Sequence, residues 1–180
     1  MRTLMTLSLA ALSAAAVAAC ADTRPVPYEK LAQEDQVNGF RIAVVDVCLQ
    51  SAMAGTPVSA MAGEDGPIVP AAPELVSQRG EGAFYSPRNA KDVLIRADGQ
   101  MCEVTTQGAL TKAAQASLEE ALSDPHGFVL DKAEALGKPT DKRFSKKVGA
   151  QTYRVRLAGS GVGGEAPSSK LTATVTAAPA

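Results

Sequence analysis

The chain is poor in aromatic side chains and in histidine. Its 180 residues include no Trp, four Phe, three Tyr and one His, and aromatic residues make up 4% of the chain. A zinc site needs three or four protein ligands, and a single His does not supply them. The sequence therefore predicts a modest aliphatic core, and it predicts no metal and no cofactor.

The chain also lacks an excess of either charge. It carries 18 basic and 19 acidic side chains, which gives a formal net charge of -1. This balance excludes a globally basic nucleic-acid-binding protein. Hydrophobic residues make up 46% and charged residues 21% of the chain, which excludes disordered and fibrous classes. The composition is that of one soluble domain of ordinary size.

The N-terminal segment has the pattern of a secretory signal. Arg2 supplies one positive charge, and an apolar run rich in Leu and Ala follows from Leu4 to Val17. This run is too short to cross a hydrocarbon core of about 30 Å comfortably as a helix. Residues 1–19 are therefore predicted to be a signal peptide.

The end of this segment, Val17-Ala18-Ala19-Cys20, resembles the lipobox of bacterial lipoproteins. The resemblance implies that Cys20 becomes the lipid-modified first residue and that the membrane is a partner through that lipid. In such proteins Ala21 is compatible with sorting to an outer membrane, which implies a place in the bacterial cell envelope, facing the periplasm. The alternative is ordinary cleavage after Ala16-Val17-Ala18.

A single domain over residues 28–180 is expected after a tether over residues 20–27, which contains two prolines. Apolar positions at three- and four-residue steps predict helices over 35–55 and 110–122, with Thr111 as a possible cap of the second. A strand over 42–47 is the alternative, because that segment is β-branched. Residues 55–82 predict a long loop and 159–169 a Gly/Ser/Pro connector.

Turn residues predict two hairpins. Asp98-Gly99 joins the strands of the first, over 93–104, and Gly149-Ala150 those of the second, over 142–158. Residues 128–130 predict a short strand, and residues 171–176 predict a last strand at an edge of the sheet. The expected class is α+β, with two helices packed on a mainly antiparallel sheet built from hairpins. The sequence shows no internal repeat.

Cys48 and Cys102 are predicted to form one disulfide. Lipidation of Cys20 would leave these two cysteines in an oxidising compartment, whereas free thiols or metal ligands are the alternative. The order of elements, with Cys102 just past a hairpin turn in Met101-Cys102-Glu103-Val104, is similar to that of uncharacterised small secreted proteins of proteobacteria. That resemblance implies no activity.

No catalytic residue is predicted. Residues 159–164 match the spacing GxGxxG, but Pro167 follows at once and the dinucleotide motif needs a helix there. His126 has no nucleophile motif beside it, and its position just beyond a helix suits a charged imidazole. The pairs Glu64-Asp65 and Glu119-Glu120 are expected to be a loop turn and a solvated helix face.

The second hairpin concentrates positive charge. In its expected register, Phe144 faces Val155 and Lys146 faces Tyr153. One side then carries Phe144, Val148, Tyr153 and Val155 toward the core. The other side, the basic hairpin face, consists of Arg143, Lys147, Arg154 and Arg156.

Arg143 is expected directly opposite Arg156 on the basic hairpin face, which costs a few tenths of a kcal/mol unless an anion covers the pair. This arrangement suggests an anionic envelope component or an acidic protein as a partner. The alternative is a solvated face that acidic residues of the same fold neutralise.

These features predict a lipid-anchored cell-envelope binding or assembly module without a catalytic site. Its working surfaces would be the basic hairpin face and the loop over 55–82. One alternative is an exported hydrolase, which would bring His126 into a cleft. Another is a soluble periplasmic ligand-binding protein, with an apolar pocket between the first helix and the sheet.

Overall fold

The computed structural model describes residues 28–76, 81–99, 101–131, 141–160 and 169–179. The predicted signal peptide, the tether with Cys20, and the connector residues 161–168 lie outside these ranges. Among the described helices, none is long and apolar enough to cross a membrane.

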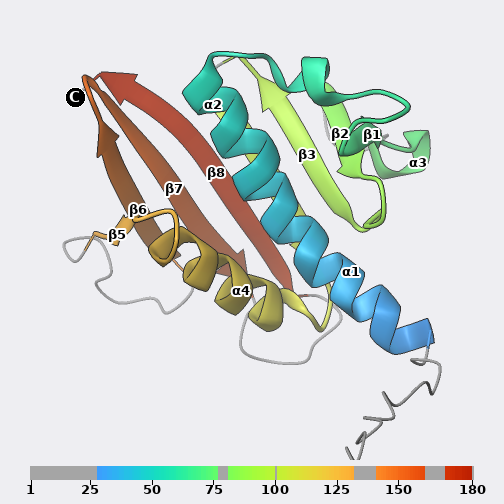
Figure 1. Cartoon of the computed structure of the whole chain (residues 1–180). Helices are drawn as coiled ribbons and strands as arrows, with labels where there is room; N and C mark the ends of the chain where they lie inside the picture. Colours follow the sequence, from blue (N-terminus) through green and yellow to red (C-terminus); the bar gives the residue numbers. More distant parts are fainter. Residues whose placement is uncertain (1–27, 77–80, 100, 132–140, 161–168, 180) are drawn as a thin grey trace, which may run out of the picture.

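One long helical segment runs along the sheet (Figure 1). It consists of α1 (Tyr28–Ile42), the π-helical turn η1 (Ala43–Leu49) and α2 (Gln50–Ala54). The predicted helix is confirmed, although it begins before residue 35. The alternative of a strand over 42–47 is wrong, because the β-branched residues of η1 are buried against the sheet and this packing outweighs their strand propensity.

The expected long loop contains regular structure. It includes η2 (Val58–Met61), β1 (Ile68–Pro70) and α3 (Pro73–Val76), and β2 (Ala83–Pro87) follows it. Burial of Ile68 orders this segment, since β1 pairs with β2 and the Ile68 side chain is fully buried. The Arg88 guanidinium also fixes it by donating to the carbonyl oxygens of Gly63, at 2.7 Å, and of Glu64. Short elements of regular structure therefore interrupt the segment that was predicted to be one long loop.

Both predicted hairpins and the second helix are confirmed. The first hairpin is β3 (Val93–Asp98) with β4 (Met101–Gln107), and the second is β6 (Asp141–Val148) with β7 (Gln151–Ser160). Between them lie α4 (Thr111–Ser123) and the short strand β5 (Val129–Leu130). Thr111 does not cap α4 as expected. Leu110 is the N-cap residue, and the buried Thr111 hydroxyl has no hydrogen-bond partner.

The described strands form one antiparallel sheet of eight, in the order β1-β2-β3-β4-β8-β7-β6-β5. The last strand, β8 (Lys170–Pro179), lies at its centre between β4 and β7, so the expectation of an edge strand is wrong. The reason is its apolar inner face, where Leu171, Ala173 and Val175 are all buried in the core. The sheet has more strands than the sequence predicted. An antiparallel sheet with packed helices is confirmed.

The chain repeats its order of elements without repeating its sequence. Each half has a main helix followed by four strands, and the two sets of strands meet where β4 pairs with β8. The long helix and α4 cover the same face of the sheet (Figure 1). Polar contacts fix both helices: the Gln36 amide donates to Thr106 Oγ1 at 2.8 Å, and Lys142 Nζ lies 2.7 Å from Glu119 Oε2.

Candidate functional site

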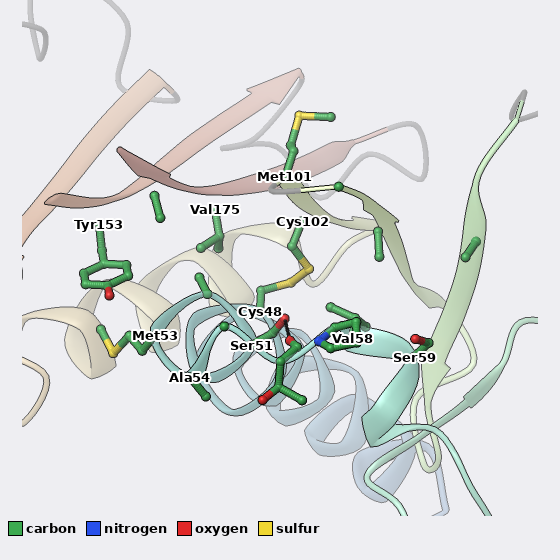
Figure 2. A pocket seen from close by; sticks show the side chains of 18 of the residues that line it. Cys48, Ser51, Met53, Ala54, Val58, Ser59, Met101, Cys102, Tyr153 and Val175 are labelled. Atoms are coloured by element: carbon green, nitrogen blue, oxygen red, sulfur yellow. Dashed lines mark hydrogen bonds between the residues drawn. A yellow bond between two sulfur atoms is a disulfide. The ribbon is translucent and has the colours of Figure 1, made fainter. Parts of the chain in front are cut away.

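A groove of about 900 Å³ lies between the end of the long helix and the inner face of the sheet. We call it the α2 groove. Residues 51–59 form its helical side, and strands from β2 to β7 form the other. Figure 2 shows this lining, with Met53 near Tyr153 on one side of the disulfide and Val58 and Ser59 on the other.

The floor of the α2 groove is a row of small side chains that crosses four strands. Ala83 pairs with Ala97, Ala97 with Cys102, and Cys102 with Val175. Directly opposed residues of neighbouring strands point to the same face, so these four side chains form one line across the sheet. Ala83 is exposed and Ala97 is half-buried, whereas Cys102 and Val175 are buried, so the row is open to solvent at its β2–β3 end.

The lining is uncharged. None of the described residues that line the groove is Asp, Glu, Lys, Arg or His, although 21% of the chain is charged. Its polar side chains include the phenols of Tyr85 and Tyr153, and the Ser51 hydroxyl donates to the carbonyl oxygen of Thr56 at 2.5 Å. Such a lining favours uncharged, mainly apolar ligands, because an ion placed there would lose hydration without gaining a partner.

The predicted disulfide is confirmed and lies in this lining. Cys48 of η1 and Cys102 of β4 are bonded, with their Cα atoms 5.6 Å apart. Figure 2 shows the bond between the helix and the sheet at the centre of the groove lining. Cys48 is fully buried, so the disulfide forms the core side of the groove and holds its two walls together.

Two exposed apolar side chains lie at the same end of the molecule as the groove. Met53 of α2 is 42% exposed and Val148, at the β6–β7 turn, is 47% exposed. Val148 shares the inner face with Phe144 but does not reach the core, so the prediction that it packs there is wrong. Phe144, Tyr153 and Val155 are buried as expected.

The register of the second hairpin is confirmed. Phe144 pairs with Val155, Lys146 with Tyr153, and Arg143 with Arg156, so the four residues of the basic hairpin face share one side of the sheet. That face is partly neutralised from within the fold. Arg156 donates to both carboxylate oxygens of Asp141, with Nε–Oδ1 at 3.1 Å and Nη2–Oδ2 at 2.9 Å.

The basic hairpin face borders a smaller hollow of about 310 Å³, which is lined by Asp131, Phe144 and Ser145 together with Arg143 and Arg154. Arg143 interacts with other groups of the protein. Arg154 is exposed and lies directly opposite Ser145.

The remaining candidates of the sequence lie away from the α2 groove. His126 is half-buried beyond α4, and its carbonyl oxygen accepts a hydrogen bond of 2.6 Å from Lys146 Nζ. Glu119 is not part of a solvated face as expected, because it is half-buried and pairs with Lys142. Among the residues that the structure describes, no cluster of three or more His, Cys, Asp or Glu could hold a metal ion.

The sequence predicted the two cysteines of the groove lining, and one of its alternatives placed an apolar pocket between the first helix and the sheet, but it did not predict the floor of the groove. Its floor residues lie on four strands, of which β2 was not predicted and β8 was expected at an edge. The one local signal is the small size of Ala83, Ala97 and Ala177 on strands of the sheet. Known family models, curated proteins and solved structures do not match this chain.

Proposed function

We propose that this protein is an exported binding module of the bacterial cell envelope, which takes an uncharged, mainly apolar ligand in the α2 groove. The observation that carries the proposal is a groove of about 900 Å³ between the first long helix and the sheet, with no charged side chain among the described residues that line it. Ligand pockets are typically concave, of 300–1,000 Å³, and lined by apolar residues with a few polar groups.

Binding is favoured over catalysis because the described residues of the groove lining include no carboxylate, imidazole or amine. General acid–base catalysis most often uses an imidazole, a carboxylate or an amine within hydrogen-bond reach of the reacting group, and the titratable side chains in the described lining are the phenols of Tyr85 and Tyr153. His126, the chain's one imidazole, does not line the α2 groove. The alternative of a hydrolase acting through that residue therefore has no support from the groove.

The proposal keeps the lipid on Cys20 as the anchor. The helix begins at Tyr28 and the groove lies at its other end, roughly 40 Å away at 1.5 Å per residue. An anchor near residue 20 would thus be attached to the end of the domain that is remote from the groove.

The test is a titration of the purified protein with Nile red, an uncharged apolar dye whose fluorescence rises on leaving water. We expect saturable binding at one site, which Ala97→Leu weakens on the order of tenfold because the added carbons displace buried ligand surface. Ala116→Leu on the exposed side of α4 is the matched control and should leave binding unchanged. Equal titrations for both variants would overturn the proposal.

A second function, the capture of an anionic partner by the basic hairpin face, has one observation in its favour. The hollow of about 310 Å³ brings Arg154 next to the Ser145 hydroxyl, and these groups together could hold a phosphate or carboxylate group. The bond between Arg156 and Asp141 weakens the argument, because part of the positive charge is already compensated.

A further inference from the structure

We infer that Tyr153 sets the specificity of the α2 groove: its phenol donates a hydrogen bond to a neutral carbonyl oxygen of the ligand, whose apolar body lies beside Met53. This inference rests on the proposed function and names the polar group that the groove recognises. It is carried by a buried phenol that lines the groove and has no hydrogen-bond partner among the described residues.

The position of Tyr153 follows from the pairing of the last two strands. Tyr153 of β7 lies directly opposite Ala177 of β8, and the next pair on the same face is Gln151 opposite Pro179. All four residues line the groove. Gln151 and Pro179 are exposed, whereas Tyr153 is only 7% exposed. Tyr153 therefore lies at the inner end of an opening whose rim includes the exposed pair.

The end of the long helix forms the other wall of this opening. Figure 2 shows the Tyr153 hydroxyl pointing away from the sheet, toward Met53 of α2. Met53 is 42% exposed, and Gly55, the C-cap of α2, has open space where a Cβ would lie. This side of the groove therefore has room for a ligand, and the flexible thioether of Met53 can adapt to its shape.

The Tyr153 hydroxyl is an unused hydrogen-bonding group. Buried Tyr side chains usually find a partner for this group. Within the part of the chain that the structure describes, no residue forms a hydrogen bond with it. The polar side chain opposite Tyr153 is that of Lys146, and its Nζ already lies 2.6 Å from the carbonyl oxygen of His126. The fold thus leaves the phenol available to a ligand.

The partner that suits this hydroxyl is a neutral acceptor. A phenol is a stronger donor than acceptor, because the lone pair of its oxygen is delocalised into the ring. An anion would also accept the bond, but the described lining offers it no cation, and the Lys146 ammonium is held by His126. A carbonyl oxygen accepts the bond without bringing a charge into the groove. The expected ligand class is therefore an apolar ketone, ester or similar carbonyl compound.

The experiment measures displacement of Nile red by three compounds of similar size, which are acetylnaphthalene, ethylnaphthalene and naphthoate. Tyr153→Phe removes only the hydroxyl, so it should weaken binding of the ketone about threefold to tenfold and leave binding of the hydrocarbon unchanged. Naphthoate should compete more weakly than the ketone in the unaltered protein. Because the dye itself carries a carbonyl group, its affinity is measured for each variant before the competition.

Tyr85→Phe is the matched control, because it removes the other phenol of the described lining. Tyr85 lies on β2, and β3, β4 and β8 separate that strand from β7. This variant should leave the affinities of all three compounds unchanged.

Three results would overturn the role of Tyr153. In the first, Tyr153→Phe weakens the ketone no more than the hydrocarbon. In the second, Tyr85→Phe weakens the ketone as much as Tyr153→Phe does. In the third, naphthoate competes as well as the ketone. All three leave the proposed function standing, since Nile red still binds in the groove. If Nile red does not bind to the unaltered protein, the proposed function itself fails.

Discussion

Loss of the disulfide should cost this protein a large share of its stability. The bond joins Cys48 and Cys102, which are 54 residues apart in sequence. In the chain-entropy model, closing a loop of this length restricts the unfolded chain by about 4 kcal/mol of free energy. Typical free energies of unfolding are about 5 to 15 kcal/mol, so the reduced protein should be only marginally stable.

The assay is guanidinium unfolding of the oxidised protein, the reduced protein and the variants Cys48→Ala, Cys102→Ala and the double variant. We expect each single variant to lose nearly as much as the double variant, because either one removes the same bond. The midpoint of thermal unfolding should fall by about 8 to 16 °C for a chain of this length. The slope of the unfolding free energy against denaturant should rise, since the unlinked chain exposes more surface.

Two results would refute this reasoning. One is a loss below about 1 kcal/mol in the double variant, which would mean that the bond constrains neither state appreciably. The other is additivity of the two single variants, because independent side chains add whereas the two halves of one bond do not. Thiol titration of the unfolded, unreduced protein is the control that the bond has formed in the sample.

Other predictions concern the helix packing, the charged face and the anchor. Gly39→Ala should destabilise the protein by about 1 to 3 kcal/mol in thermal unfolding, because the added Cβ would lie 2.2 Å from the Cβ of Ala90. This loss should occur although Ala favours helices over Gly. The control is Asn38→Ala at the exposed neighbouring position, which should not destabilise the protein. Reversing all four residues of the basic hairpin face to Glu should abolish salt-sensitive binding to anionic vesicles if that face captures anions, and unchanged binding would remove this candidate function. The intact mass from native envelopes should correspond to a chain that starts at Cys20 with acyl groups, and it should rise by about two hydrogens on reduction. An unmodified chain that starts near Ala19 would contradict the anchor.

Local patterns in the sequence predicted those parts of the fold that depend on neighbouring residues. The register of β6 and β7 follows from a two-residue turn, which fixes every pair from Asp141 opposite Ala158 to Val148 opposite Gln151. The second helix follows from apolar spacing. The disulfide follows from the number of cysteines and the expected compartment.

Features that depend on distant residues were not predicted. Residues 171–176 look like an edge strand because Thr alternates with small apolar residues, and only the pairing with β4 and β7 reveals a central strand. In the sequence, Ile68 is one apolar residue in a Gly- and Pro-rich segment. Only the pairing of β1 with β2 in the structure shows that it belongs to a strand of the sheet. Asp141 looks like a minor exception to a basic segment, yet it binds the Arg156 guanidinium through two hydrogen bonds.

The position of the α2 groove follows from the unequal lengths of the two helices. The long helix extends along the whole sheet, whereas α4 has 13 residues and spans roughly 20 Å. Figure 1 shows α4 over one end of β7 and β8, with α2 near the other end. At that second end, α2 is the helix that faces the inner side of β8 and β7.

The exposure of two side chains shows that α4 does not cover this end of the inner face of the sheet. Val148 points to the inner face and is nonetheless 47% exposed, whereas Phe144, four residues earlier on the same strand, is 3% exposed. The difference arises because α4 reaches the start of β6, where Glu119 pairs with Lys142, and does not reach its end. A longer α4 would bury Val148 and fill the space beside Tyr153. The groove is therefore a product of helix length and strand order, which is why no local motif in the sequence predicts where it lies.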